Sequence, residues 1–263
     1  MNATATNANP RLARTPYQGA AQILVFNWRM YAGTATAVCV AFAVWPVEGV
    51  WAHVATLAFA MPAIFWIATS IAVSHYLYDR YPLYDFGWLQ ETLDAMPRRW
   101  INLHAGLDET STLIEARFGG ARGEVVDIFD AQTMTEPSIR RARQRNGTAA
   151  PAMRARFDAL PFDDARFDAA FLIFAAHELR RHEERVRLLR EVARVLDAGG
   201  ELVLMEHLRN GWNYAAFGPG ALHFFSRRAW TRAAHEAGLK LKSEFTRTSF
   251  VRVFVMRRAR CEC

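Results

Sequence analysis

Lysine and cysteine are scarce in this chain of 263 residues, and both scarcities limit the classes of protein it can belong to. Only two of the 32 basic side chains are lysines, and the net charge of +6 is spread along the chain. Proteins that bind nucleic acid usually gather positive charge on one face, so we expect no nucleic-acid partner. Cys39 stands alone, and Cys261 and Cys263 follow at the far end, a spacing that predicts neither a disulfide framework nor a metal site.

Charge is absent from one long block near the N-terminus. Between Tyr31 and Tyr78 the only formally charged residue is Glu48, which lies in the short connection between two apolar runs, residues 31–47 and 50–76. A helix needs about 20 apolar residues to cross a bilayer, and tryptophan and tyrosine gather near the ends of both runs. The pattern predicts a transmembrane helical hairpin. Because the first run is short, a buried hairpin of a soluble protein is the alternative.

Arginines flank this block and predict its orientation. Three precede the first run and three follow the second: Arg11, Arg14, Arg29, Arg80, Arg98 and Arg99. The connection between the runs has no lysine or arginine, so the positive-inside rule places both ends in the cytoplasm. We expect an inner membrane of the bacterial type, with the lipid bilayer as a partner and the remaining chain on the cytoplasmic side.

From Trp100 onward, short apolar runs alternate with amphipathic stretches. The expected strands are residues 101–105, 124–128, 155–158, 169–174, 201–206, 239–245 and 250–256. The expected helices are residues 110–118, 136–144, 178–196 and 226–237. This alternation predicts an α/β fold with a mostly parallel sheet, helices on both faces and an antiparallel final pair of strands. The predicted divisions are a leader (1–30), the hairpin (31–78), a linker (79–99), the α/β domain (100–257) and a tail (258–263).

Two stretches of the α/β domain carry a family resemblance. Residues 157–171 read FDALPFDDARFDAAF, and residues 188–204 read LLREVARVLDAGGELVL. Both, with the strand and long helix between them, strongly resemble the class I S-adenosylmethionine-dependent methyltransferases, and in particular their quinone-type branch. The resemblance covers about residues 100–257 and implies a Rossmann-like sheet, S-adenosylmethionine as cofactor and methyl transfer as the activity.

The resemblance also implies residues that hold the cofactor. Asp127 ends the second expected strand, where an acidic side chain receives the ribose hydroxyls, and Asp130 competes for this role. Asp158 and Ala159 follow the third strand, where similar enzymes bind the adenine, although Asp158 could instead cap a turn. Phe174, at the end of the fourth strand, completes this set.

The turn after the first strand departs from the family pattern of three glycines. Only Gly106 matches a family glycine, and His104 replaces the usual acid. Asp108 and Glu109 stand where further glycines are expected. In one interpretation His104, Asp108 or Glu109 holds the methionine part of the cofactor differently. In the other, the domain has lost the cofactor and binds something else.

The methyl acceptor of similar enzymes binds after the fourth and fifth strands. His177 follows the fourth strand, and His207 opens a long loop, residues 206–225, that is rich in aromatic residues and glycine. Imidazole titrates near neutrality, so either histidine could remove a proton from the acceptor, with His177 as the first candidate and His207 as the second. Each could equally cap a helix or fill an edge of the fold.

Together these features predict a membrane-anchored methyltransferase that acts by direct displacement on a lipophilic acceptor. The acceptor classes are a quinone or phenol, a pigment, or a lipid head group. The alternative is a cofactor-dead binding or scaffold subunit of a membrane biosynthetic complex. The sequence leaves open a homo-oligomer or membership of such a complex.

Overall fold

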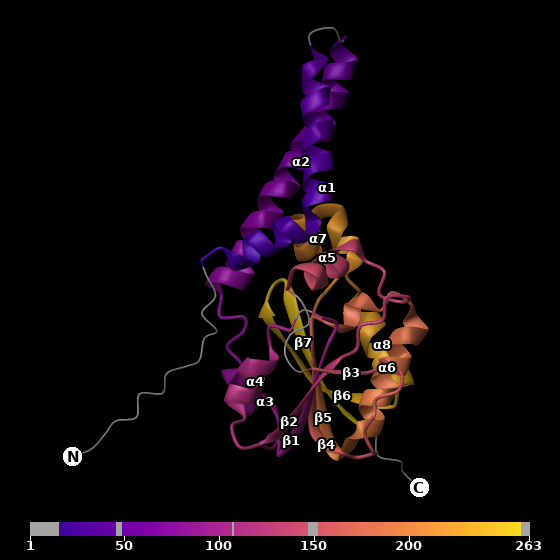
Figure 1. Cartoon of the computed structure of the whole chain (residues 1–263). Helices are drawn as coiled ribbons and strands as arrows, with labels where there is room; N and C mark the ends of the chain where they lie inside the picture. The colour runs from indigo at the N-terminus through magenta and orange to yellow at the C-terminus, as the bar shows by residue number, and fades with distance from the viewer. Residues whose placement is uncertain (1–15, 46–48, 107, 147–151, 259–263) are drawn as a thin grey trace, which may run out of the picture.

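Two long helices, α1 (Gln18–Ala43) and α2 (Val50–His75), form an antiparallel pair that stands out from an α/β domain (Figure 1). The computed structural model describes residues 16–45, 49–106, 108–146 and 152–258. Arg11, Arg14, Glu48, Cys261 and Cys263 lie outside these ranges. The first helix begins at Gln18, well before the predicted start of the hairpin, because the apolar pattern of residues 19–26 continues into the run that follows.

The first helix has two parts that serve different places in the fold. Asn27 has non-helical angles (φ −116°, ψ 15°), and its side chain donates to the carbonyl of Ile23. The kink lets the part before Asn27 lie across the top of the α/β domain while the part after it packs along α2 (Figure 1). The second helix continues into a π-helical turn, η2 (Tyr76–Arg80), whose Asp79 accepts the backbone N–H groups of Gly19 and Ala20.

The outer part of the helix pair exposes large apolar side chains. Trp51 is 82% exposed and Phe65 is 53% exposed. Among the described residues, one continuous helix, Val50–Arg80, is long and apolar enough to cross a membrane, with a mean hydropathy of 1.8 in its most apolar window. Only its length and composition support this helix as a membrane span. Among the described residues, α1 does not meet the same criterion of length and hydropathy.

The domain is built on a seven-stranded sheet in the order β3-β2-β1-β4-β5-β7-β6. The strands are β1 (Arg99–His104), β2 (Arg122–Asp127), β3 (Met153–Arg154), β4 (Phe167–Ile173), β5 (Leu196–His207), β6 (Leu239–Thr248) and β7 (Val251–Arg258). The first five run parallel to one another, and β7 is antiparallel to both β5 and β6. The prediction of a mostly parallel sheet with an antiparallel final pair is therefore confirmed.

Helices cover both faces of this sheet, each through its own apolar cluster. One cluster packs α5 (Pro137–Asn146), α6 (His182–Val195) and α8 (Arg227–Glu236) against the sheet, with Trp230 fully buried. The other packs α3 (Gly87–Thr92) and α4 (Ser111–Arg117) against the opposite face. A further short helix, α7 (Gly211–Phe217), lies in the long loop after β5 and contacts α2.

Two predicted elements differ from the structure. The strand expected at residues 155–158 is a turn, because Ala159 donates its N–H to the carbonyl of Arg156 and the side chains of Arg156 and Asp158 pair across it. The helix expected from residue 178 begins at His182, after a 3-10 turn, η3 (Ala176–Glu178). Arg181 is extended there, and its N–H is accepted by Glu184, which sets the start of the helix.

Candidate active site

The carboxyl ends of β1 and β2 lie side by side and bring His104 into register with Asp127. Both side chains are buried. The Nδ1 atom of His104 accepts the N–H of Gly106, and its buried Nε2 atom has no hydrogen-bond partner. Gly106 has φ +111°, a backbone conformation that favours glycine, so the one family glycine in this turn is required by its geometry. These are features of a turn that admits a ligand close to its backbone.

An arginine from α5 occupies the space in front of this turn. Arg143 contacts both carboxylate oxygens of Asp127, at 3.0 and 2.9 Å. A Cβ atom at Gly106 would overlap the Arg143 side chain, and the guanidinium also lies over the ring of Phe129 at 4.2 Å. Asp127, which the family resemblance assigns to the ribose, is therefore paired with Arg143 of the same chain.

Asp108 and Glu109 have structural partners of their own. One oxygen of Asp108 accepts the N–H groups of Thr110 and Ser111, at 3.1 and 2.9 Å, and so caps the start of α4. Glu109 accepts from the side chains of Gln22 and Tyr84, at 3.0 and 3.1 Å, and joins the first part of α1 to the domain. Both carboxylates, which stand where the family has glycines, are therefore held by groups of the protein itself.

The turn after β3 is closed by its own residues. Asp158 forms two hydrogen bonds with Arg156, at 3.0 and 3.2 Å, and Arg187 lies 3.6 Å from it. The N–H of Ala159, expected to face the adenine, donates to the carbonyl of Arg156 at 3.3 Å. The carboxylate of Asp158 is thus paired with arginine side chains in this structure.

The loop after β4 holds a buried chain of ionisable groups. Glu206 at the end of β5 is fully buried and accepts the N–H groups of Ala176 and His177. Its second oxygen is 2.8 Å from Nδ1 of His177, and Nε2 of His177 is 3.4 Å from Glu178. The imidazole therefore lies between two carboxylates, one on each ring nitrogen.

This arrangement changes the role expected for His177. Burial lowers the pKa of this histidine, but the negative charges of Glu206 and Glu178 outweigh burial and raise its pKa to about 10. An imidazolium has no lone pair with which to take a proton, so at neutral pH His177 is not a general base. This geometry therefore does not support His177 as the general base.

His207, the second candidate, has the opposite environment. Its ring is stacked between Phe174 and Phe224, each 5.0 Å away, and this burial lowers its pKa to about 4. Nδ1 lies 3.0 Å from the carbonyl of Phe250, an acceptor, so Nδ1 carries the proton. Nε2 then accepts the hydroxyl of Tyr78 from the π-helical turn, at 2.8 Å. His207 is therefore a neutral imidazole whose Nε2 already accepts a hydrogen bond.

A cavity of about 170 Å³ separates the first part of α1 from the ends of β1 and β4. The helix contributes Ile23 and Phe26 to its wall, and the domain contributes Phe174, His177 and Glu178. Tyr78 and Glu109 also line it. Phe174 has φ +52°, an uncommon conformation for a large side chain, and it turns the chain from β4 into the cavity wall. The wall mixes apolar side chains with polar and charged ones from several elements, and His177 and Glu178 form its end at the loop after β4.

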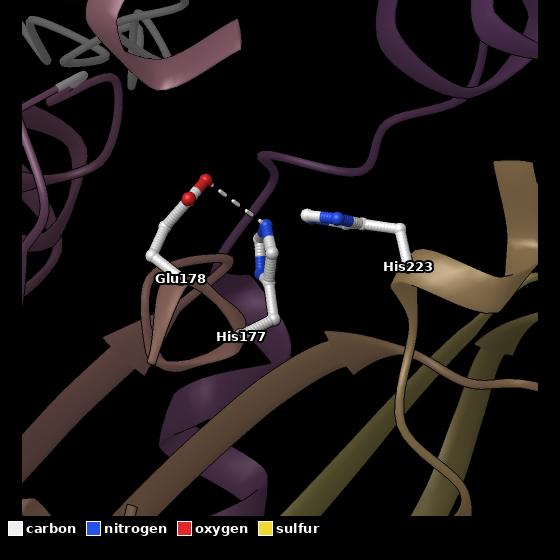
Figure 2. A group of neighbouring side chains, drawn as sticks. All are labelled: His177, Glu178 and His223. Atoms are coloured by element: carbon white, nitrogen blue, oxygen red, sulfur yellow. Dashed lines mark ion pairs between the residues drawn. The ribbon is translucent and has the colours of Figure 1, made fainter. Parts of the chain in front are cut away.

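One group of side chains at this end comes from separate loops. His177 and Glu178 follow β4, and His223 belongs to a 3-10 helix, η4 (Gly218–His223), in the loop after β5. Figure 2 shows the three side chains pointing toward one another, with the imidazole of His177 in the middle. The sequence predicts no metal site, and only the fold brings these three residues together.

Comparison with known proteins matches the domain to one family. The family described as "Methyltransferase domain" matches residues 118–204. A demethylmenaquinone methyltransferase from Thermus thermophilus is 32% identical over 126 residues, which cover 46% of this chain and 54% of the relative. The chain therefore spans about half the length of that relative.

Solved structures agree at the level of the fold. The mitomycin 7-O-methyltransferase MmcR has a TM-score of 0.56 and 16% identity, covering 94% of this chain and 74% of its own. A SAM-dependent methyltransferase from Methanosarcina mazei has a TM-score of 0.48 and 15% identity, covering 65% and 97%. The first of these supports the Rossmann-like fold of this chain.

Several residues of the site were not predicted from the sequence. Tyr78, Glu206 and His223 carry no motif, and Arg143 lies in a stretch that reads as an ordinary basic helix. Glu206 stands next to His207 at the end of an apolar run, which is the one local sign of a buried acidic residue at a strand end. The others are placed by contacts between elements distant in sequence.

Proposed function

We propose that this chain, whose α/β domain is a class I S-adenosylmethionine-dependent methyltransferase domain, transfers a methyl group to a lipophilic acceptor of the quinone or phenol type. The observation that carries the proposal is the cavity beneath α1. Its wall combines apolar side chains of the helix with the loop after β4. Methyl acceptors of this fold bind at the carboxyl ends of the strands, and an acceptor there would lie directly under the apolar helix pair.

The residues at the ends of β1 and β2 fit the cofactor. Asp127 offers a buried carboxylate to the ribose hydroxyls, and the buried Nε2 of His104 has no hydrogen-bond partner within the described residues. When bound, the cofactor supplies an electrophilic methyl group. For Asp127 to hold the ribose, its pair with Arg143 must open.

The protein's own groups then position the acceptor and remove its proton. A hydroxyl of the acceptor in the cavity would face Tyr78, whose own proton is already directed at Nε2 of His207. Tyr78 passes its proton to His207 as it takes the proton of the acceptor. The aromatic walls exclude water, and the protein contributes chiefly by holding the nucleophile in line.

The exposed helix pair supports membrane attachment as part of the proposal. Val50, Trp51 and Phe65 point outward, and apolar exposure on this scale is unusual for a protein in water. Arg29 and Arg80 lie near the base of the pair, so the positive-inside rule favours a cytoplasmic domain at an inner membrane. A lipophilic acceptor could then enter from the bilayer along α1.

A transfer assay tests this function. The full chain is incubated with S-adenosylmethionine labelled in its methyl group and a lipid extract of bacterial membranes. We expect label in the organic phase with the wild-type chain and none with the Asp127→Asn variant. If label transfer is absent while the cofactor binds, a lipophilic acceptor is contradicted.

A vesicle flotation assay tests the attachment separately. The wild-type chain is expected to float with vesicles, and the double variant Trp51→Asp/Phe65→Asp is expected to float less. The matched double variant Arg190→Ala/Arg232→Ala, which changes exposed positions of the domain, should float as the wild type does. Equal flotation of all three would contradict insertion through the helix pair.

One observation favours a second candidate function. Arg143 closes the ribose carboxylate and covers Gly106, and the turn lacks two of the family glycines. A domain fixed in this state would be a cofactor-dead scaffold subunit in a membrane biosynthetic complex. Calorimetry with S-adenosylmethionine distinguishes the two functions, because the scaffold predicts no binding.

A further inference from the structure

We propose that His177, Glu178 and His223 bind one divalent transition-metal ion at the acceptor end of the cavity. The three possible ligand atoms, two imidazole nitrogens and one carboxylate oxygen, lie within 4.8 Å of one another. They come from two loops that follow β4 and β5, the strands whose loops face the acceptor (Figure 2). Two histidines with one carboxylate form a donor set that binds zinc or ferrous iron and leaves positions open for other ligands.

The separations suit an ion. A zinc ion about 2.0–2.1 Å from each ligand in tetrahedral geometry places the ligand atoms about 3.3 Å apart. Nε2 of His177 is already 3.4 Å from the carboxylate of Glu178. The ligand atoms lie at most 4.8 Å from one another. At that separation, each atom would be less than about 1 Å too far from a zinc ion placed at their common centre. Rotation of the His223 side chain, 26% exposed, can close that gap.

The surrounding contacts hold the ligands in place. Nδ1 of His177 is bonded to Glu206 at 2.8 Å, which directs Nε2 toward the proposed ion. Binding of the ion displaces the proton that Nε2 carries in its absence, and this proton leaves to solvent. A carboxylate behind a histidine in this way is a common support of metal ligands. Arg180 donates to the carbonyls of His177 and His223, at 3.2 and 2.6 Å, and so ties the two loops together.

A second observation points to a missing ligand. Oε2 of Glu178 is buried and has no hydrogen-bond partner, although the residue is only 6% exposed. A buried carboxylate oxygen without a partner is costly, and the oxygen belongs to the same carboxylate that faces His177. An ion between the three side chains would satisfy it.

The ion would also act in methyl transfer, and this part of the inference rests on the proposed function. His177 and Glu178 line the cavity, so an open coordination position would face the acceptor. A hydroxyl or carbonyl oxygen of a quinone-type acceptor bound there would be held and polarised by the ion. The pair of Tyr78 and His207 would still take the proton of the acceptor.

Cobalt(II) titration of the full chain tests the site without cofactor or acceptor. We expect one Co²⁺ per chain and the visible absorption of a low-coordinate ion with nitrogen ligands. The variants His223→Ala and Glu178→Gln should each bind at least about 10-fold more weakly. The control His182→Ala removes a histidine that also pairs with a carboxylate, Glu236 at 2.8 Å, and it should bind as the wild type does.

Two results would overturn the site. One is the absence of stoichiometric Co²⁺ binding by the wild-type chain. The other is equal affinity in the wild type and in both ligand variants, with circular dichroism showing that all are folded. Because the titration contains neither cofactor nor acceptor, its failure would leave the transfer assay unaffected, and failure of the transfer assay would leave the metal site standing.

Discussion

Replacement of Arg143 by alanine should increase the affinity of the chain for S-adenosylmethionine. In the structure Arg143 holds both oxygens of Asp127, at 2.9 and 3.0 Å, and its side chain covers Gly106. The cofactor must compete with this pair for the same carboxylate. Removing the guanidinium removes the competitor and leaves Asp127 with one hydrogen bond, from the N–H of Phe129 at 3.1 Å, until the ribose arrives.

The magnitude follows from the burial of the pair. Asp127 is 5% exposed and Arg143 is 16% exposed at their side chains, so the pair is largely shielded from water. A hydrogen bond to a charged group contributes about 1.5–3 kcal/mol. In the wild type the cofactor must break one such bond, between Arg143 and Asp127, before it can bind the carboxylate. Without that cost the dissociation constant of the cofactor should fall by roughly 10- to 100-fold. The free energy of unfolding should fall by about 1–3 kcal/mol, because a buried carboxylate loses its charged partner and keeps only the N–H of Phe129.

Isothermal titration calorimetry with S-adenosylmethionine measures the effect. Arg145→Ala is the matched control, because it removes the same charge from an exposed position of α5. We expect the dissociation constant of this control to equal that of the wild type. An unchanged or larger dissociation constant in Arg143→Ala would refute the reasoning, since Arg143 would then not oppose the cofactor.

Three further predictions concern the rest of the fold and the relay. Tyr78→Phe should lower the methyl-transfer rate by about 100-fold without changing cofactor affinity, because the path to His207 is interrupted; an unchanged rate would contradict the relay. Asp79→Ala removes the carboxylate that caps the start of α1 and should cost about 1–2 kcal/mol. Hydrogen exchange should then show lower protection over residues 18–26, and unchanged protection there would contradict the cap. Asp168 is partly buried, but hydrogen bonds from β1 outweigh burial and lower its pKa. Its stabilisation is therefore present above about pH 4 and is lost as pH falls through the lowered pKa. Asp168→Asn should destabilise the chain at pH 7 and less at about pH 3.5 in urea titrations; an equal loss at both pH values would contradict this assignment.

The sheet could be predicted from the sequence because its strands carry local signals. The runs at residues 169–173 and 202–205 are wholly apolar, as expected for strands buried on both faces. In the structure β5 begins at Leu196, before the predicted start at residue 201, so the strand is longer than predicted. The edge strand β3 was misplaced because only Met153 and Arg154 pair with β2, and the alternating residues after them close a turn instead.

The site was predicted in part, and the missing part depends on tertiary contacts. Asp127 and His104 could be located because each ends a predictable strand. The charge state of His177 could not, since it depends on Glu206, which is 29 residues away and belongs to the neighbouring strand. Tyr78 reaches His207 across 129 residues, a contact that no local pattern encodes.

Equilibrium dialysis of the full chain against radiolabelled S-adenosylmethionine tests the central claim most directly, that this altered site still binds the methyl donor. We predict saturable binding of one cofactor per chain and its loss in the Asp127→Asn variant. The absence of saturable binding by the wild-type chain, with its fold intact, would contradict the claim and favour the scaffold function.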